Sequence, residues 1–141
     1  MLVSSLAALL LLASPPAHAE VPVVVIVSVA NPVTKLDREA LSKLYLRKEL
    51  RWADGTEAMI LQPASRAAQE AFAKQVHQKS WKEVQHHYQQ FVFSSRGSAP
   101  TEKKDDASVA AAVAKFPNAI GYVTAVPTDP GVKVVEVTAD R

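Results

Sequence analysis

Runs of β-branched residues mark the first and last parts of the chain. Residues 21–29 are nearly all valine and isoleucine, with Ser28 as the only polar residue. A run that is apolar at consecutive positions is typical of a strand buried on both faces of a sheet. Shorter runs at residues 58–61, 119–123 and 132–137 predict three further strands.

Between these runs, apolar residues recur at helical spacing. Each such segment follows a residue that can cap a helix: Asp37, Ser65, Ser80, and either Asp105 or Asp106. The side chains expected to face inward are Leu41, Leu44 and Tyr45; Ala68, Phe72 and Val76; Trp81, Val84, Tyr88 and Phe91; and Val109, Ala112, Val113 and Phe116. Four helices are therefore predicted.

Strands separated by helices predict an α/β fold. Helices on both faces of one sheet give a three-layer sandwich, and 141 residues are enough for a single core. Residues 94–104 are polar and are expected to form a loop.

Composition removes several classes of protein. The net charge is only +2, so the chain lacks the basic face of a dedicated nucleic-acid binder. The one tight basic pair, Lys103 and Lys104, is followed at once by Asp105 and Asp106. With no cysteine, disulfides and thiolate metal sites are excluded.

Residues 1–19 have the pattern of a signal peptide. They carry no charged side chain, and a short apolar run ends in Ser-Pro-Pro and then Ala-His-Ala. Small residues at these last positions suit signal peptidase, so we expect cleavage before Glu20 and an exported, periplasmic domain at residues 20–141. The alternative is a buried N-terminal helix. The run is shorter than a membrane span, so no transmembrane segment is expected after cleavage.

Two segments resemble a known family. Residues 41–48 read Leu-Ser-Lys-Leu-Tyr-Leu-Arg-Lys, and residues 52–55 read Trp-Ala-Asp-Gly. Residues 109–113 read Val-Ala-Ala-Ala-Val, and residues 117–123 read Pro-Asn-Ala-Ile-Gly-Tyr-Val. In this order they resemble the second lobe of the phosphate-binding proteins of phosphate ABC transporters. The resemblance implies one lobe of periplasmic-binding-protein type, with phosphate or a related oxyanion as ligand and a transporter membrane component as partner.

The family holds phosphate at a Gly-Ser-Gly-Thr-type turn that begins a helix, after an arginine. The matching residues here are 62–66, and Ser65 takes the place of the family's hydroxyl. The glycines are missing, and Gln62 stands near the arginine position. We expect Arg66 or Arg96 to supply the charge in place of that arginine, because guanidinium matches the geometry of an oxyanion.

The loop at residues 94–98 concentrates hydroxyl groups around an arginine and a glycine. It is either an anion-binding nest or a solvated loop. The expected oxyanion-binding residues are Ser65, Arg66, Ser95, Arg96 and Ser98.

Residues 20–141 are too few to contain the other lobe of the family as well. We therefore expect a homodimer or another protein to complete the cleft. The alternative function is a protein-interaction module that keeps the fold and has lost its ligand.

No enzyme motif is present, so no catalytic residue, cofactor or metal is expected. His77, His86 and His87 are expected to be solvated, since adjacent helical histidines diverge by about 100°. Trp52 and Trp81 lie beside apolar helical stripes and are expected in the core.

Overall fold

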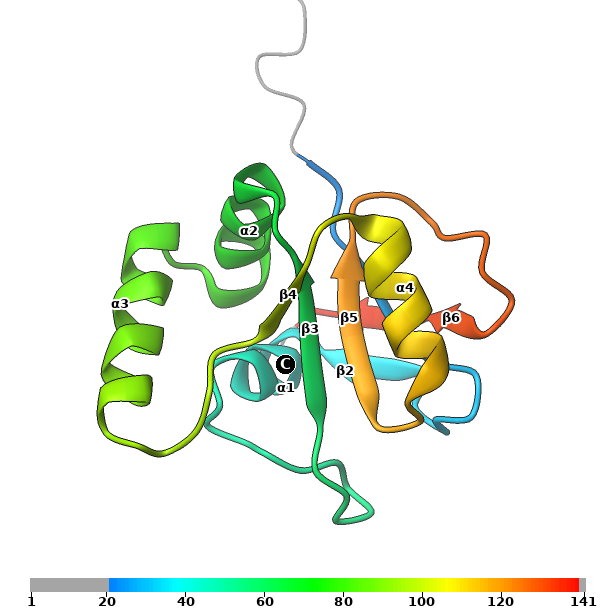
Figure 1. The fold of residues 1–141 in the computed structure, drawn as a ribbon, viewed down its shortest axis with the longest axis horizontal. Coiled ribbons are helices and arrows are strands. Elements are labelled where there is room, and N and C mark those ends of the chain that lie inside the picture. Colours follow the sequence, from blue (N-terminus) through cyan, green and yellow to red (C-terminus); the bar gives the residue numbers. More distant parts are fainter. Residues whose placement is uncertain (1–20, 140–141) are drawn as a thin grey trace, which may run out of the picture.

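The computed structural model describes residues 21–139 and shows a five-stranded sheet with strand order β4-β3-β5-β1-β6 (Figure 1). The expected leader at residues 1–19 lies outside the described residues. The strands of this sheet are β1 (Val24–Ser28), β3 (Met59–Pro63), β4 (Thr101–Lys103), β5 (Ala119–Val123) and β6 (Val132–Val134). A separate two-stranded parallel sheet joins β2 (Lys35–Asp37) to β7 (Glu136–Thr138).

The helices cover both faces of the main sheet. They are α1 (Arg38–Tyr45), α2 (Arg66–Phe72), α3 (Trp81–Phe93) and α4 (Asp106–Lys115), and α2 continues into a π-helical turn, η1 (Ala73–His77). Helices α1 and α2 lie on one face and α4 lies on the other, while α3 lies at the outer side of the domain, beyond β4 (Figure 1). The three-layer α/β sandwich predicted from the sequence is confirmed.

Each helix begins where its capping residue predicted. The side chains of Asp37, Ser65, Ser80 and Asp105 accept hydrogen bonds from the N–H groups of Ala40, Ala68, Glu83 and Ser108, over 2.6, 3.3, 3.1 and 2.8 Å respectively. These bonds satisfy amide groups that a helix leaves unpaired in its first turn. Asp105, and not Asp106, caps α4.

The direction of the strands gathers three strand ends at one edge. Strand β3 lies between β4 and β5 and is parallel to both, with Pro63 opposite Lys103 and Met59 opposite Ala119. Strand β1 is antiparallel to β5 and β6. The carboxyl ends of β3, β4 and β5 therefore lie together, which is the edge where open α/β sheets bind ligands.

The core is divided by the sheet into two parts. On the α1 and α2 face, the rings of Phe72 and Tyr122 stack with centroids 4.0 Å apart, and the Tyr45 hydroxyl donates to the Leu61 carbonyl over 2.7 Å. On the α4 face, Val109 and Val113 pack over Gly121. A Cβ at Gly121 would lie 2.6 Å from a methyl carbon of Val109. The close approach of α4 to β5 at this point therefore requires glycine.

Three sequence expectations need correction. The segment at residues 94–104 is not all loop, because it contains the edge strand β4. The strand expected at residues 132–137 is two strands, divided at Val135, where the chain leaves β1 and pairs with β2. Phe116 is more than one-third exposed, because α4 ends before it and its backbone is extended.

Candidate functional site

The candidate site at the strand-end edge is built on the junction between β3 and α2. Ser65 follows β3, and its side-chain oxygen caps α2. The N–H of Ala64 donates to the Lys103 carbonyl over 2.7 Å, which holds the chain after β3 against the end of β4. Ser65 and Arg66 are both exposed at this edge.

Arg66 is held against the beginning of α3. Its guanidinium carbon lies 3.4 Å from the centroid of the Trp81 ring, which is a cation–π contact. The indole N–H of Trp81 donates to Gln69 Oε1 over 3.2 Å and so fixes the ring. This stacking leaves the N–H groups at the edge of the guanidinium plane available to an anion.

Lys103 and Lys104 belong to the same edge, which the sequence analysis did not anticipate. The carboxylates of the two aspartates that follow already accept hydrogen bonds within the fold. Asp105 caps α4, and hydrogen bonds from Ser108 hold the pKa of its carboxyl below the usual range. Within residues 21–139, the ion pairs involve neither lysine.

Asp106 accepts its hydrogen bonds from a different part of the chain, the residue after β5. Its Oδ2 accepts hydrogen bonds from the backbone N–H and the hydroxyl of Thr124, over 2.9 and 2.7 Å. Both aspartates are therefore engaged in hydrogen bonds of the fold, although Lys104 still contributes to the low pKa of Asp105. Lys103 is the last residue of β4 and Lys104 follows it, and a strand of three residues is too short to be recognised from its sequence pattern.

The loop at residues 94–98 lies at the carboxyl end of α3. The N–H groups of Ser94 and Ser95 donate to the carbonyls of Gln90 and Val92, each over 3.0 Å. Arg96 Nε donates to Ser94 Oγ over 3.0 Å. Two of the N–H groups that an anion nest would need therefore already donate to carbonyls of α3. The negative end of the helix dipole also points toward this loop, which disfavours an anion there.

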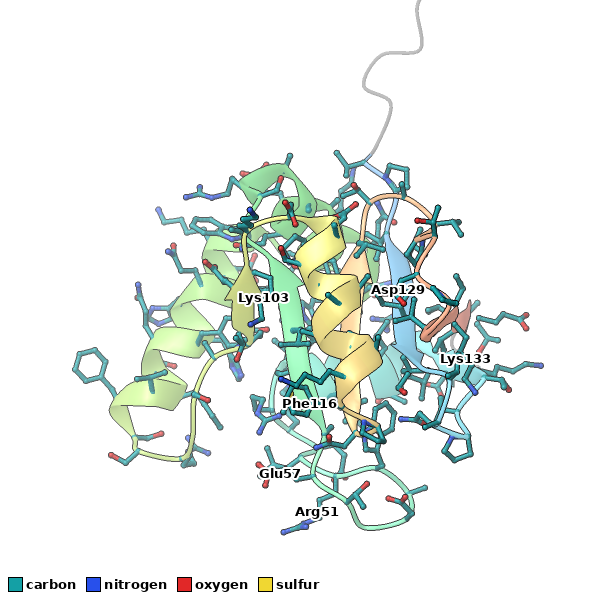
Figure 2. The ribbon with its side chains drawn as sticks, turned by 45° about the vertical axis from the view of Figure 1, so that its right-hand side comes forward. Arg51, Glu57, Lys103, Phe116, Asp129 and Lys133 are labelled. Atoms are coloured by element: carbon teal, nitrogen blue, oxygen red, sulfur yellow. The ribbon has the colours of Figure 1, made fainter. Side chains whose placement is uncertain are left out.

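The five expected residues form two separate groups. Ser98 lines a pocket of about 300 Å³ with Glu57 and Met59, at the beginning of β3, whereas Ser65 and Arg66 follow the end of this five-residue strand. The strand's rise separates its two ends by about 13 Å. Figure 2 shows Glu57 and Lys103 at different heights of the domain, and one small oxyanion does not reach both groups.

The expectation that the histidines are solvated is wrong for His77. This residue is only 6% exposed, and its Nδ1 lies 2.7 Å from the hydroxyl oxygen of Ser42. Burial lowers its pKa to about 4, with smaller contributions from His87 and Arg38. Its Nε2 has no hydrogen-bond partner among the described residues.

The other histidines differ from each other. His86 is exposed, and His87 Nε2 lies 2.6 Å from the Leu46 carbonyl oxygen. Between residues 21 and 139, no three His, Asp or Glu side chains are grouped as metal ligands would be.

Of the two tryptophans expected in the core, Trp52 is buried, whereas Trp81 is only half-buried. None of the helices in this range has the length and apolar character needed to cross a membrane.

Solved structures share this fold. A protein from Clostridium perfringens, described as a phosphate ABC transporter substrate-binding protein with bound phosphate, is 18% identical with a TM-score of 0.65. The match covers 82% of this chain and 44% of that one. A possible phosphate-binding protein from Planctomyces limnophilus is 14% identical with a TM-score of 0.62, over 85% of this chain and 43% of the other.

A third match is an ABC-type phosphate transport receptor from Vibrio cholerae, which is 16% identical with a TM-score of 0.55. It covers 82% of this chain and 46% of the receptor. The sequence itself matches no protein-family model and no curated protein. The chain thus spans less than half the length of these structures and has the fold of part of them, which confirms the family resemblance at the level of architecture.

Proposed function

We propose that this protein is an exported, solute-binding-like protein that binds phosphate or a related oxyanion without covalent chemistry. The observation that carries the proposal is the fold, which is shared with phosphate-transport binding proteins, one of them with phosphate bound. The domain acts by binding and not by catalysis, and the ligand contacts the edge where β3 and β4 end.

The chemistry of this edge suits an oxyanion. The first-turn N–H groups of a helix have no carbonyl partner within the helix, and the positive end of the dipole adds to their attraction. Positive charge comes from Arg66, which follows Ser65 directly, and from Lys103, which is paired with Pro63 at the end of the neighbouring strand. Lys103 takes part in the proposal in addition to the residues expected from the sequence.

The edge is open to water, so the site requires a second surface. Exposed charge pairs contribute only about 0–1 kcal/mol each. A second copy of the domain, or a membrane component of an ABC transporter, would exclude water from the ligand and strengthen every contact. The loop residues Ser95, Arg96 and Ser98 remain a separate prediction, for an anion at the opposite end of β3.

The experiment is an amide NMR titration of residues 20–141 with phosphate, and with sulfate as the comparison anion. We expect saturable shifts at Ser65, Arg66 and Lys103. The substitutions Arg66→Ala and Lys103→Ala should each weaken binding several-fold. Arg96→Ala is the matched control for the shifts at Ser65, Arg66 and Lys103, because it removes another exposed guanidinium, from the loop that follows α3.

Two results would overturn the proposal. One is the absence of shifts at tens of millimolar phosphate, in the domain alone and at concentrations where it self-associates. The other is a response that Arg66→Ala and Lys103→Ala leave intact.

The second candidate function is a protein-interaction module. It is favoured by the end of α3, where Phe93 is 90% exposed and Val92 is half-exposed. This function predicts a complex, with a second copy or another protein, that forms equally well with and without phosphate and is weakened by Phe93→Ser. Sedimentation of the exported chain in the two buffers distinguishes the candidates, since anion-dependent association supports the first.

A further inference from the structure

A pocket of about 460 Å³ opens between α3 and the edge of the main sheet. It lies on the α2 side of the sheet, and none of the expected oxyanion residues lines it. Its walls are mainly apolar and include the rings of Phe72, Trp81, Tyr88 and Tyr122. A concave apolar pocket with a few polar groups is the usual form of a site for a small organic molecule.

The polar groups of the pocket are connected by hydrogen bonds. Gln69 Nε2 donates to Glu102 Oε1 over 3.0 Å, and Gln62 Nε2 approaches the same oxygen at 3.5 Å. The Tyr122 hydroxyl donates to Gln62 Oε1 over 3.2 Å, and the Trp81 indole donates to Gln69 Oε1. Side chains from β3, β4, β5, α2 and α3 therefore support one another, and the site is organised before any ligand binds.

The charge of the pocket defines its ligand. Glu102 is the one carboxylate in its lining, and neither lysine nor arginine lines it. The imidazole of His77 is also part of the lining, and burial keeps it neutral near pH 7. The Glu102 carboxylate would repel an anion here, whereas a nitrogen head group with N–H donors would pair with it.

His77 provides an independent observation. One ring nitrogen is used by Ser42, and Nε2 is buried without a partner among the described residues. Buried polar groups in native proteins are nearly always hydrogen-bonded, and the exceptions often mark a binding site. The same imidazole is part of the pocket wall, where it adds a neutral polar group beside the aromatic rings.

We propose that this pocket binds a compact organic molecule with an aromatic body and an uncharged or cationic nitrogen head group. The body lies among Phe72, Trp81 and Tyr88, and the head group donates to Glu102. This site adjoins the oxyanion edge, because Arg66 stacks on the Trp81 ring, and it differs from that edge in the sign of the charge that it accepts.

Benzamidine, benzamide and benzoate are suitable probes, because they share size and shape and differ in charge. The readout is the pair of indole N–H signals, since the chain has two tryptophans. The Trp81 indole belongs to the pocket, and the Trp52 indole donates to the Asn118 carbonyl outside it and serves as an internal control. We expect benzamidine and benzamide to shift the Trp81 signal saturably and leave Trp52 unchanged.

The substitution Glu102→Gln tests the origin of the charge preference. We expect it to reduce the preference for benzamidine over benzamide by about tenfold, the equivalent of about 1.4 kcal/mol. Glu70→Gln is the matched control, because Glu70 is an exposed glutamate of α2 that does not line the pocket. Thermal unfolding of both variants verifies that the fold is retained.

Three results would overturn the proposal: a Trp81 signal unmoved by all three probes, an equal response to benzoate that persists in Arg66→Ala, or a preference that survives Glu102→Gln. Failure here leaves the oxyanion proposal untouched, because phosphate is followed at Ser65 and Lys103.

Discussion

Ser42 Oγ and His77 Nδ1 lie 2.7 Å apart in the interior and connect α1 to the π-helical turn. His77 also meets the Phe72 ring edge to face, with centroids 5.2 Å apart. The imidazole is therefore packed as a neutral ring, because burial and the neighbouring positive groups disfavour its protonated form.

The first prediction is a loss of stability in mild acid. The pKa of His77 is about 4 in the folded protein and about 6.5 in an unfolded chain, so the unfolded state takes up a proton first. The free energy of unfolding should fall by about 3 kcal/mol as the pH decreases from 7 to 4. Urea unfolding across this range measures it. In His77→Phe the slope between pH 6.5 and 4 should largely disappear, and an unchanged slope would contradict the assignment.

The second prediction concerns Gly121→Ala. The new methyl would lie 2.6 Å from Val109 Cγ1, so α4 must move or Val109 must leave its rotamer. We expect a loss of about 1–3 kcal/mol in the free energy of unfolding. Val109→Ala provides the control, since the double variant should lose less than the sum of the single losses. Strictly additive losses would show that the two residues do not meet.

The third prediction concerns the contact between Asp106 and Thr124. Asp106→Ala removes the acceptor of two hydrogen bonds that join α4 to the end of β5. We expect it to cost about 1–3 kcal/mol, more than the loss of about 1 kcal/mol for removing the cap in Asp105→Ala. Chemical denaturation of the two variants side by side checks the order, and a reversed order would contradict it.

The fourth prediction concerns the attachment of α3. The Tyr88 hydroxyl donates to the Tyr45 carbonyl over 2.7 Å, and burial raises the pKa of Tyr88, so the group remains a donor. Tyr88→Phe should cost about 1 kcal/mol and increase hydrogen exchange in α3 more than in β5. Uniform acceleration throughout the chain would instead indicate that α3 does not open separately.

The long elements were predictable because their residues carry the information locally. The apolar run at β5 and the caps at Ser65 and Ser80 place those elements without knowledge of their neighbours. The strands β2, β4 and β7 are three residues each and have too few positions for a pattern. Their existence depends on partners that lie far away in the sequence.

The candidate site was less predictable for the same reason. The positions of Ser65 and Lys103 relative to each other follow from the pairing of β3 with β4, which no local pattern reveals. The separation of Ser65 from Ser98 likewise follows from the direction of β3. Burial of His77 depends on the π-helical turn, which directs this side chain inward at a position where α-helical spacing predicts exposure.

The position of β1 also bears on how the domain reaches its native state. This strand is the first of the fold, yet it lies in the sheet between β5 and β6, so Val24 pairs with Val123 and Ser28 pairs with Val132. Pairings between distant segments close large loops and form slowly. A chain that emerges from its N-terminus must therefore keep β1 unpaired until β5 and β6 are present. During that interval, residues 24–28 are the segment most exposed to aggregation, and a chaperone that delays collapse would act there.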